Sequence, residues 1–129
     1  SEEELRAVNP MDLLDLAESD LSERMAEAAS RGELFREQPF VMGLPAGQVD
    51  GSDSDETILI QGIIDAFFYE DGQIVLLDYK TDYVRRASEL REKYHAQLEY
   101  YEQALSMMTG KKVKEKLIYS FTLGEVIEV

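Results

Sequence analysis

The segment Asp78-Tyr79-Lys80 holds an acid and an amine two residues apart, a combination that can carry hydrolytic chemistry. It ends an apolar run that begins at Ile74, and such a run favours a β-strand. Because side chains alternate along a strand, we expect Asp78 and Lys80 on one face and Tyr79 on the other. A carboxylate and an ammonium group would then share one site.

A second apolar, β-branched run covers 58–69 and is joined to the first by 70–73, which reads E-D-G-Q. Asp-Gly between two hydrophobic runs is a strong signal for a two-residue hairpin. In that hairpin Asp65 faces Asp78, with Cβ atoms about 5 Å apart, unless a β-bulge shifts the register. Two facing carboxylates repel, so we expect a shared proton or a bound cation between them. Ligands that are all oxygen favour Mg²⁺ or Mn²⁺.

The tripeptide also has a simpler interpretation. D-x-K arises by chance in many chains that are rich in acids and lysines, and a surface Asp–Lys pair contributes only about 0–1 kcal/mol. The expected pairing with Asp65, inside an otherwise apolar strand, favours a functional site instead.

The composition indicates one domain over residues 1–129, with 44% hydrophobic residues and room for a core. The chain has no cysteine, which excludes disulfides and thiolate metal sites. It has no apolar run long enough to cross a membrane and opens with S-E-E-E, unlike a signal peptide. We therefore expect a cytoplasmic protein. The charged opening and the ending inside a strand suggest a piece of a larger protein.

The net charge is −14, from 27 acidic and 13 basic residues. This is the opposite of the basic surface expected of a free-standing nucleic-acid binder. Bound divalent ions could neutralise part of a nuclease site, or an associated partner could bind the substrate. The charge also leaves open a module that contacts proteins without catalysis.

The elements that must position these residues follow from pattern and caps. Helices are predicted from Asn9-Pro10 and over about 20–29, and a first strand over 33–42. Residues 43–56 are predicted as a surface loop; their oxygen-rich part could suggest a calcium loop but fails the EF-hand template. Apolar residues at three- and four-residue steps predict a helix over 85–108, ended by Gly110.

Strands at 117–121 and 126–129 complete the chain. The order is helices, three strands, a long helix and two strands. This order predicts an α/β or α+β fold with a mixed sheet.

Four ordered segments resemble the PD-(D/E)xK nuclease superfamily, in which a hairpin presents one acid and then an acid-x-lysine triplet. They are R-E-Q-P-F at 36–40, G-I-I-D at 62–65, L-D-Y-K-T-D at 77–82 and Y-H-A-Q-L-E-Y-Y at 94–101. The nearer resemblance is to the C-terminal nuclease domains of AddA-type subunits of AddAB helicase-nucleases, which are related to RecB. Four segments in order are far more specific than one D-x-K. The resemblance implies a restriction-endonuclease-like core, with a central mixed sheet flanked by helices.

The resemblance also implies roles for single residues. Asp65 and Asp78 would be metal ligands, the backbone carbonyl of Tyr79 a further ligand, and Mg²⁺ or Mn²⁺ the ion. Lys80 would be the catalytic lysine. Glu37 matches the first acidic motif and would bind or support the metal; a surface glutamate on a strand is the alternative.

Gln97 and Tyr101 match a Q-x-x-x-Y element that is associated in this branch with DNA contact and active-site support. Their spacing of four places them on one helix face; simple packing is the alternative. Ile64 stands where the family name has proline, which is a common substitution. RecB-like members also have an upstream helical histidine that helps to bind metal, and the only histidine here, His95, does not match it. We therefore expect the fragment alone to bind metal weakly or to be inactive.

The implied function is a metal-dependent DNA exonuclease domain of an ATP-dependent helicase-nuclease, acting on double-strand break ends for recombinational repair. The implied partners are DNA single strands delivered by the helicase, the rest of the AddA chain and an AddB-type partner. The chain has no G-x-x-x-x-G-K-[ST] loop and so cannot be the motor. The alternative is a non-catalytic nuclease-like module for protein contact or DNA guidance. A Ser-His-Asp hydrolase is not supported, because no nucleophile-elbow sequence is present.

Overall fold

The computed structural model describes residue 16 and residues 19–51 and 55–129. Its centre is one five-stranded sheet with the strands in chain order. The strands are β1 (Leu34–Pro45), β2 (Thr57–Glu70), β3 (Gln73–Lys80), β4 (Val113–Ser120) and β5 (Glu125–Glu128). The helices in the described part are α3 (Asp20–Ser30), α4 (Ala46–Asp50) and α5 (Ala87–Thr109).

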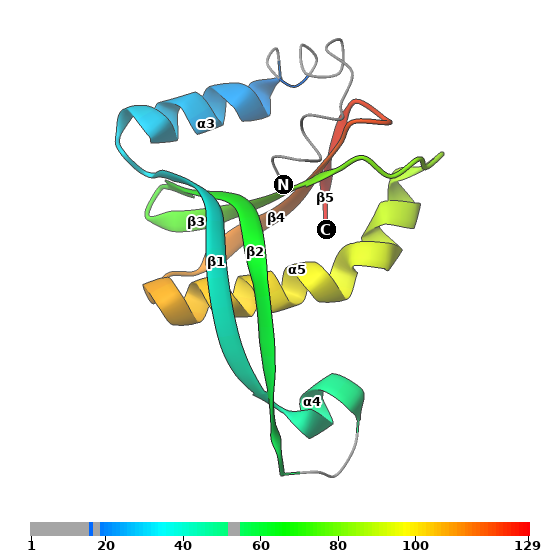
Figure 1. The fold of residues 1–129 in the computed structure, drawn as a ribbon. Helices are drawn as coiled ribbons and strands as arrows, with labels where there is room; N and C mark the ends of the chain where they lie inside the picture. The colour runs from blue at the N-terminus through cyan, green and yellow to red at the C-terminus, as the bar shows by residue number, and fades with distance from the viewer. Residues whose placement is uncertain (1–15, 17–18, 52–54) are drawn as a thin grey trace.

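The sheet is mixed, because β3 and β4 are parallel and the other neighbouring pairs are antiparallel. A parallel pair needs a long crossover connection, and α5 supplies it. Figure 1 shows α3 on one side of the sheet and α5 on the other. The expected α+β fold with a mixed sheet between helices is confirmed.

Each face of the sheet carries its own apolar core. On the α5 side, Leu76 and Phe67 pack with Leu90, Leu98 and other buried residues. On the α3 side lies a second cluster that includes Phe68, Val75, Leu77, Tyr79, Tyr119, Leu21 and Met25. The middle of β3 is therefore buried on both faces, which explains its continuous apolar sequence.

The Asp-Gly turn forms as the sequence predicts. Asp71 has a φ of 54° and Gly72 a φ of 75°, and positive φ at both central residues defines a type I′ turn. From this turn, β2 and β3 pair regularly from Glu70–Gln73 to Ala66–Leu77. The next pair in this register is Asp65 with Asp78, as expected.

The predicted surface loop over 43–56 is wrong in part. β1 continues to Pro45, and α4 follows directly. Gly43, Leu44 and Pro45 pair with residues of β2, and Leu44 is buried. Cross-strand pairing and burial thus outweigh the local preference of glycine and proline for a turn.

Two further predictions concern helices. The helix predicted from Asn9-Pro10 lies outside the described residues. Met108, the last residue of the helix predicted over 85–108, is about half exposed although the spacing places it on the apolar side of the helix. Among the helices that the structure describes, none is long and apolar enough to cross a membrane.

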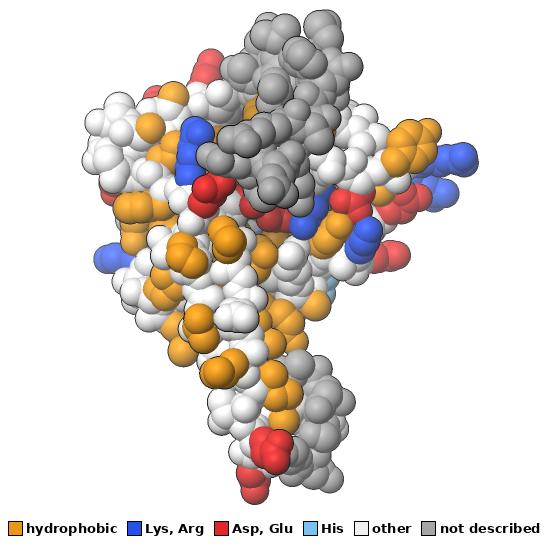
Figure 2. All heavy atoms as spheres, viewed as in Figure 1, with side chains coloured by type: hydrophobic (Ala, Val, Ile, Leu, Met, Phe, Trp, Pro, Cys, Tyr) orange, Lys and Arg blue, Asp and Glu red, His pale blue; other side chains and the backbone are white. Residues whose placement is uncertain are grey.

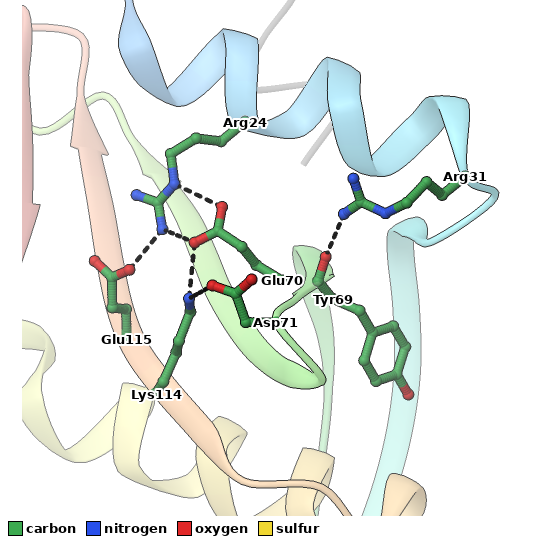
Figure 3. A network of polar contacts seen from close by, with 7 residues as sticks. All are labelled: Arg24, Arg31, Tyr69, Glu70, Asp71, Lys114 and Glu115. Carbon is green, nitrogen blue, oxygen red and sulfur yellow. Dashed lines mark hydrogen bonds and ion pairs between the residues drawn. The ribbon is translucent and has the colours of Figure 1, made fainter.

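An ionic cluster attaches α3 to the sheet (Figure 3). Arg24 donates through Nε and Nη2 to both carboxylate oxygens of Glu70, at 2.9 and 2.8 Å, and also contacts Glu115. Lys114 Nζ lies 2.8 Å from Glu70 Oε1. The bonds from Arg24 and Lys114 lower the pKa of Glu70 to about 2. The cluster therefore stabilises the fold at neutral pH, and this contribution is lost as the pH falls from about 4.5 towards 2.

Candidate active site

One cavity of about 350 Å³ brings together the side chains that the sequence singled out. It lies where β1, β2 and β3 meet the middle of α5. The residues that line it are Glu37, Pro39, Ile63, Asp65, Asp78, Lys80, Gln97 and Tyr101. Tyr79 is different, because its ring points to the opposite face of the sheet and packs with Phe121. The alternation expected for Asp78, Tyr79 and Lys80 is therefore confirmed.

Asp78 is a buried acid, with only 3% of its surface exposed. Its Oδ2 lies 2.8 Å from Lys80 Nζ, yet no donor among the described residues meets this atom with hydrogen-bond geometry. Burial raises the pKa of Asp78, and the neighbouring Asp65 carboxylate raises it further, to about 7. Lys80 opposes this shift but does not cancel it. Near neutral pH Asp78 is therefore present in both its neutral and its ionised form.

Asp65 is the ionised partner of this pair. Burial alone would raise its pKa, but hydrogen bonds from Asp78 and from the Tyr79 backbone N–H hold it below the usual value. The Tyr79 N–H donates to Asp65 Oδ2 at 2.9 Å. If the β2–β3 hydrogen-bond ladder continued, the Tyr79 N–H would donate to the backbone carbonyl of Ile64. Here the side-chain oxygen Asp65 Oδ2 accepts this bond instead. In the absence of a cation, a raised pKa of Asp78 beside a lowered pKa of Asp65 is the pattern of two carboxyl groups that hold one proton between them.

The donor set fits a hard divalent ion. Asp78 Oδ2 is a buried oxygen without a hydrogen-bond donor in the described part of the chain, and the Asp65 carboxylate lies beside it. Mg²⁺ typically takes one or two carboxylates from a protein and keeps several waters. No group of three or more His, Cys, Asp or Glu side chains with metal-binding geometry occurs among the described residues. The remaining ligands would therefore be water, backbone oxygen or substrate.

Lys80 is surrounded by three groups that hold its ammonium in the cavity. It forms an ion pair with Asp78 and donates a hydrogen bond to Gln97 Oε1 at 3.0 Å. Its Nζ also lies 3.8 Å from the centre of the Tyr94 ring, a close cation–π contact. Only 11% of the Lys80 side chain is exposed. The position of this amine is thus determined from three directions.

Tyr94 and Asp82 are residues that sequence reasoning did not assign to the site. The sequence pattern places Tyr94 only on the apolar stripe of α5, yet it is half-buried and its hydroxyl donates to both Asp82 oxygens, at 2.9 and 2.8 Å. Lys93 Nζ lies 2.6 Å from Asp82 Oδ2. The spacing of three between Tyr94 and Gln97, which places both on one helix face, could have indicated this role.

Gln97 and Tyr101 form one polar unit on α5. Gln97 Nε2 donates to the Tyr101 hydroxyl at 3.1 Å while its Oε1 accepts from Lys80. The Tyr101 ring packs edge-on against Phe40, with ring centres 5.4 Å apart. Both residues thus face the cavity, and Tyr101 also packs in the core.

Glu37 lines the cavity from β1 in an unusual backbone conformation. The flanking pairs, Arg36–Ala66 and Gln38–Ile64, place it opposite Asp65. Its φ of 49° lies in the left-handed region, which costs a residue other than glycine about 1–2 kcal/mol. His95, by contrast, is exposed on α5, with Nε2 3.1 Å from Glu99 Oε1, and does not line this cavity.

Comparisons with known proteins show the family to which the chain belongs. The family model described as the PD-(D/E)XK nuclease superfamily matches residues 2–126. The chain is 43% identical over 134 residues to the A-type subunit of the ATP-dependent helicase/nuclease of Clostridium beijerinckii, a match that covers 98% of the chain and 11% of that protein. It is 42% identical to the protein of the same name in Clostridium botulinum, over 98% of the chain and 10% of that protein.

A third relative with the same name comes from Lachnoclostridium phytofermentans. It is 36% identical over 99% of the chain and 12% of its own length. The chain therefore spans about a tenth of the length of the curated relatives that it matches.

Proposed function

Because the chain belongs to the PD-(D/E)XK nuclease superfamily, we propose that it is the metal-dependent deoxyribonuclease domain of an AddA-type protein of a helicase-nuclease. The observation that carries the proposal is the buried acid Asp78, which lies beside Asp65 and 2.8 Å from the Lys80 ammonium. In this proposal the domain acts as an exonuclease on DNA strands that a helicase delivers. The wider role is the processing of double-strand break ends for recombinational repair, together with an AddB-type partner.

In this proposal Asp65, Asp78 and the backbone carbonyl of Tyr79 hold Mg²⁺ or Mn²⁺. A bound divalent ion would supply Lewis-acid chemistry, polarising a phosphoryl oxygen and making water more acidic. Asp78 must release its proton before its oxygen can become a ligand. Glu37, opposite Asp65, would support Asp65 as a metal ligand or hold a water bound to the metal.

Lys80 supplies the fixed positive charge of the site. Asp78, Gln97 and Tyr94 hold the ammonium before substrate arrives, so little reorganisation is needed during the reaction. We assign Lys80 to orienting the attacking water and stabilising the charge that develops on the phosphate. Gln97 and Tyr101 orient Lys80 and contact the DNA strand.

The test of the proposed function is titration of Mn²⁺ into the chain by calorimetry. The control is an Asp65→Asn, Asp78→Asn double variant that has been shown to fold. The proposal expects binding by the parent chain and none by the variant, because the variant keeps the shape of the site but loses both charges. Equal binding by both would exclude the paired-acid site. Absence of binding by the folded parent would mean either that an upstream histidine is essential for metal binding or that the module does not catalyse.

Tyr94→Leu should lower kcat for DNA cleavage about 2- to 30-fold with little change in KM. The reason is that a partly buried cation–π contact contributes about 0.5–2 kcal/mol, and its loss leaves Lys80 less well positioned. Steady-state cleavage of a labelled strand gives both constants. Tyr94→Phe keeps the ring under Lys80 and should retain most of the activity. If Tyr94→Phe and Tyr94→Leu lowered kcat equally, loss of the ring contact with Lys80 would not explain the lower activity.

A further inference from the structure

The loop between β3 and α5, residues 81–86, projects an aromatic residue and two cations directly after Lys80. Tyr83 is 86% exposed, so its ring is accessible to a ligand. Arg85 and Arg86 are exposed as well. In Figure 2 basic side chains and an apolar one gather at the right-hand edge, where Figure 1 shows this loop.

The loop lies in the locally basic part of an acidic chain. The chain has a net charge of −14, yet residues 80–93 carry five basic and three acidic residues, Lys80, Arg85, Arg86, Arg91 and Lys93 against Asp82, Glu89 and Glu92. Two of the acids already accept hydrogen bonds from the protein. Asp82 accepts from Lys93 and Tyr94, and Glu89 accepts from the backbone N–H of Arg85. Neither the Arg85 nor the Arg86 guanidinium forms an ion pair with any described residue. Both charges are available to a ligand.

The base of the loop is held firmly although its tip is exposed. Asp82 accepts hydrogen bonds from Tyr94 and Lys93 on α5. The Thr122 hydroxyl, from the turn after β4, donates to the backbone carbonyl of Asp82 at 2.7 Å. The residue that precedes Tyr83 is therefore held in place, and this reduces the entropy lost when a ligand is bound.

We propose that Tyr83, Arg85 and Arg86 form a binding surface for a nucleic-acid strand, which we term the loop surface. Tyr83 stacks on an unpaired base, and the two guanidinium groups contact the phosphates on either side. Tyr83 follows Lys80 by three residues, so their Cα atoms are at most about 11 Å apart. The stacked base then belongs to the same stretch of strand as the cleaved bond. The position of the cleaved bond rests on the proposed function.

The test measures binding without cleavage. Fluorescence anisotropy of a labelled oligothymidylate, in EDTA and at low salt, gives Kd for the parent chain and its variants. Tyr83→Ala should weaken binding about tenfold, and Tyr83→Phe should restore it, because stacking needs the ring and not the hydroxyl. Arg85→Ala with Arg86→Ala should lower the slope of log Kd against log salt by about 1.4, as expected for two lost contacts to single-stranded phosphates.

Two controls separate this surface from general charge. Lys111→Ala with Lys112→Ala removes the same charge from two exposed residues beyond the other end of α5 and should leave Kd nearly unchanged. A strand of abasic sites should bind the parent and Tyr83→Ala equally, because no base is present to stack.

The proposal is overturned if the parent does not bind, if both double variants weaken binding equally, or if polyglutamate displaces the strand as well as DNA does. These outcomes leave the proposed function standing, since Mn²⁺ binding to Asp65 and Asp78 tests it independently. Conversely, strand binding that depends on Tyr83 without any Mn²⁺ binding would support the loop surface and count against the metal site in this chain.

Discussion

Lys80→Ala is expected to lower kcat for DNA cleavage by a factor of about 10²–10³, the usual effect of removing one preorganised group that stabilises charge in the transition state. The ammonium is 11% exposed and is held by Asp78, Gln97 and Tyr94. Water that enters the space left by the side chain cannot reproduce this fixed charge. The loss should appear mainly in kcat, because DNA contacts outside the cavity are unchanged.

The measurement is steady-state cleavage of labelled single-stranded DNA by the full-length helicase-nuclease protein that we propose contains this domain. Lys112→Ala provides the matched control, since it removes an exposed lysine after α5 and should keep full activity. Circular dichroism and thermal unfolding must show that Lys80→Ala still folds. Full cleavage by a folded Lys80→Ala variant would contradict the role assigned to this residue.

Without divalent ions, the free energy of unfolding should decrease as the pH rises from about 4 to about 7. Asp78 has a folded-state pKa of about 7, above the roughly 3.9 of an unfolded aspartate. Between these values the folded chain binds more protons than the unfolded chain, so stability is greatest below pH 4 for this group and is lost as the pH rises. About three pKa units correspond to at most about 4 kcal/mol. Asp65, Asp82 and Glu70, whose pKa values are lowered, change stability only at more acidic pH.

Urea unfolding in EDTA at pH 5 and pH 8 measures this difference. The substitution Asp78→Asn should abolish most of the difference in unfolding free energy between the two pH values. The variant should be more stable than the parent chain at pH 8, because the amide cannot ionise beside Asp65. Lys80 would then lose its ion pair but keep its bond to Gln97. A parent chain that is equally stable at both pH values would show that Asp78 is not held in its neutral form.

Local signals in the sequence predicted much of the fold and the central pair of acids. The apolar, β-branched runs and the Asp-Gly turn specify the β2–β3 hairpin, and the type I′ geometry of that turn sets the register. A register set at the turn extends along both strands, so the position of Asp65 beside Asp78 follows from residues within one short segment. The alternation of Asp78, Tyr79 and Lys80 follows from the same period of two.

The prediction of a surface loop over 43–56 was wrong in part, because it rested on local preference alone. Gly43 and Pro45 favour a turn locally, but the extended β1–β2 pairing that includes them, and the burial of Leu44, depend on residues well over ten positions away. Local preference cannot report the free energy of such distant contacts.

By itself, then, the sequence determined which acids face each other, which residue is the lysine beside them and to which family the chain belongs, because period, turn chemistry and motif order are short-range properties. The tertiary structure alone decided how those groups behave. Burial raises the pKa of Asp78, and the packing of α5 places the Tyr94 ring against the Lys80 ammonium and the Tyr94 hydroxyl against Asp82, just before the loop surface. Dehydration and the crossing of a helix over a sheet arise only when distant segments pack together, so no local pattern encodes them.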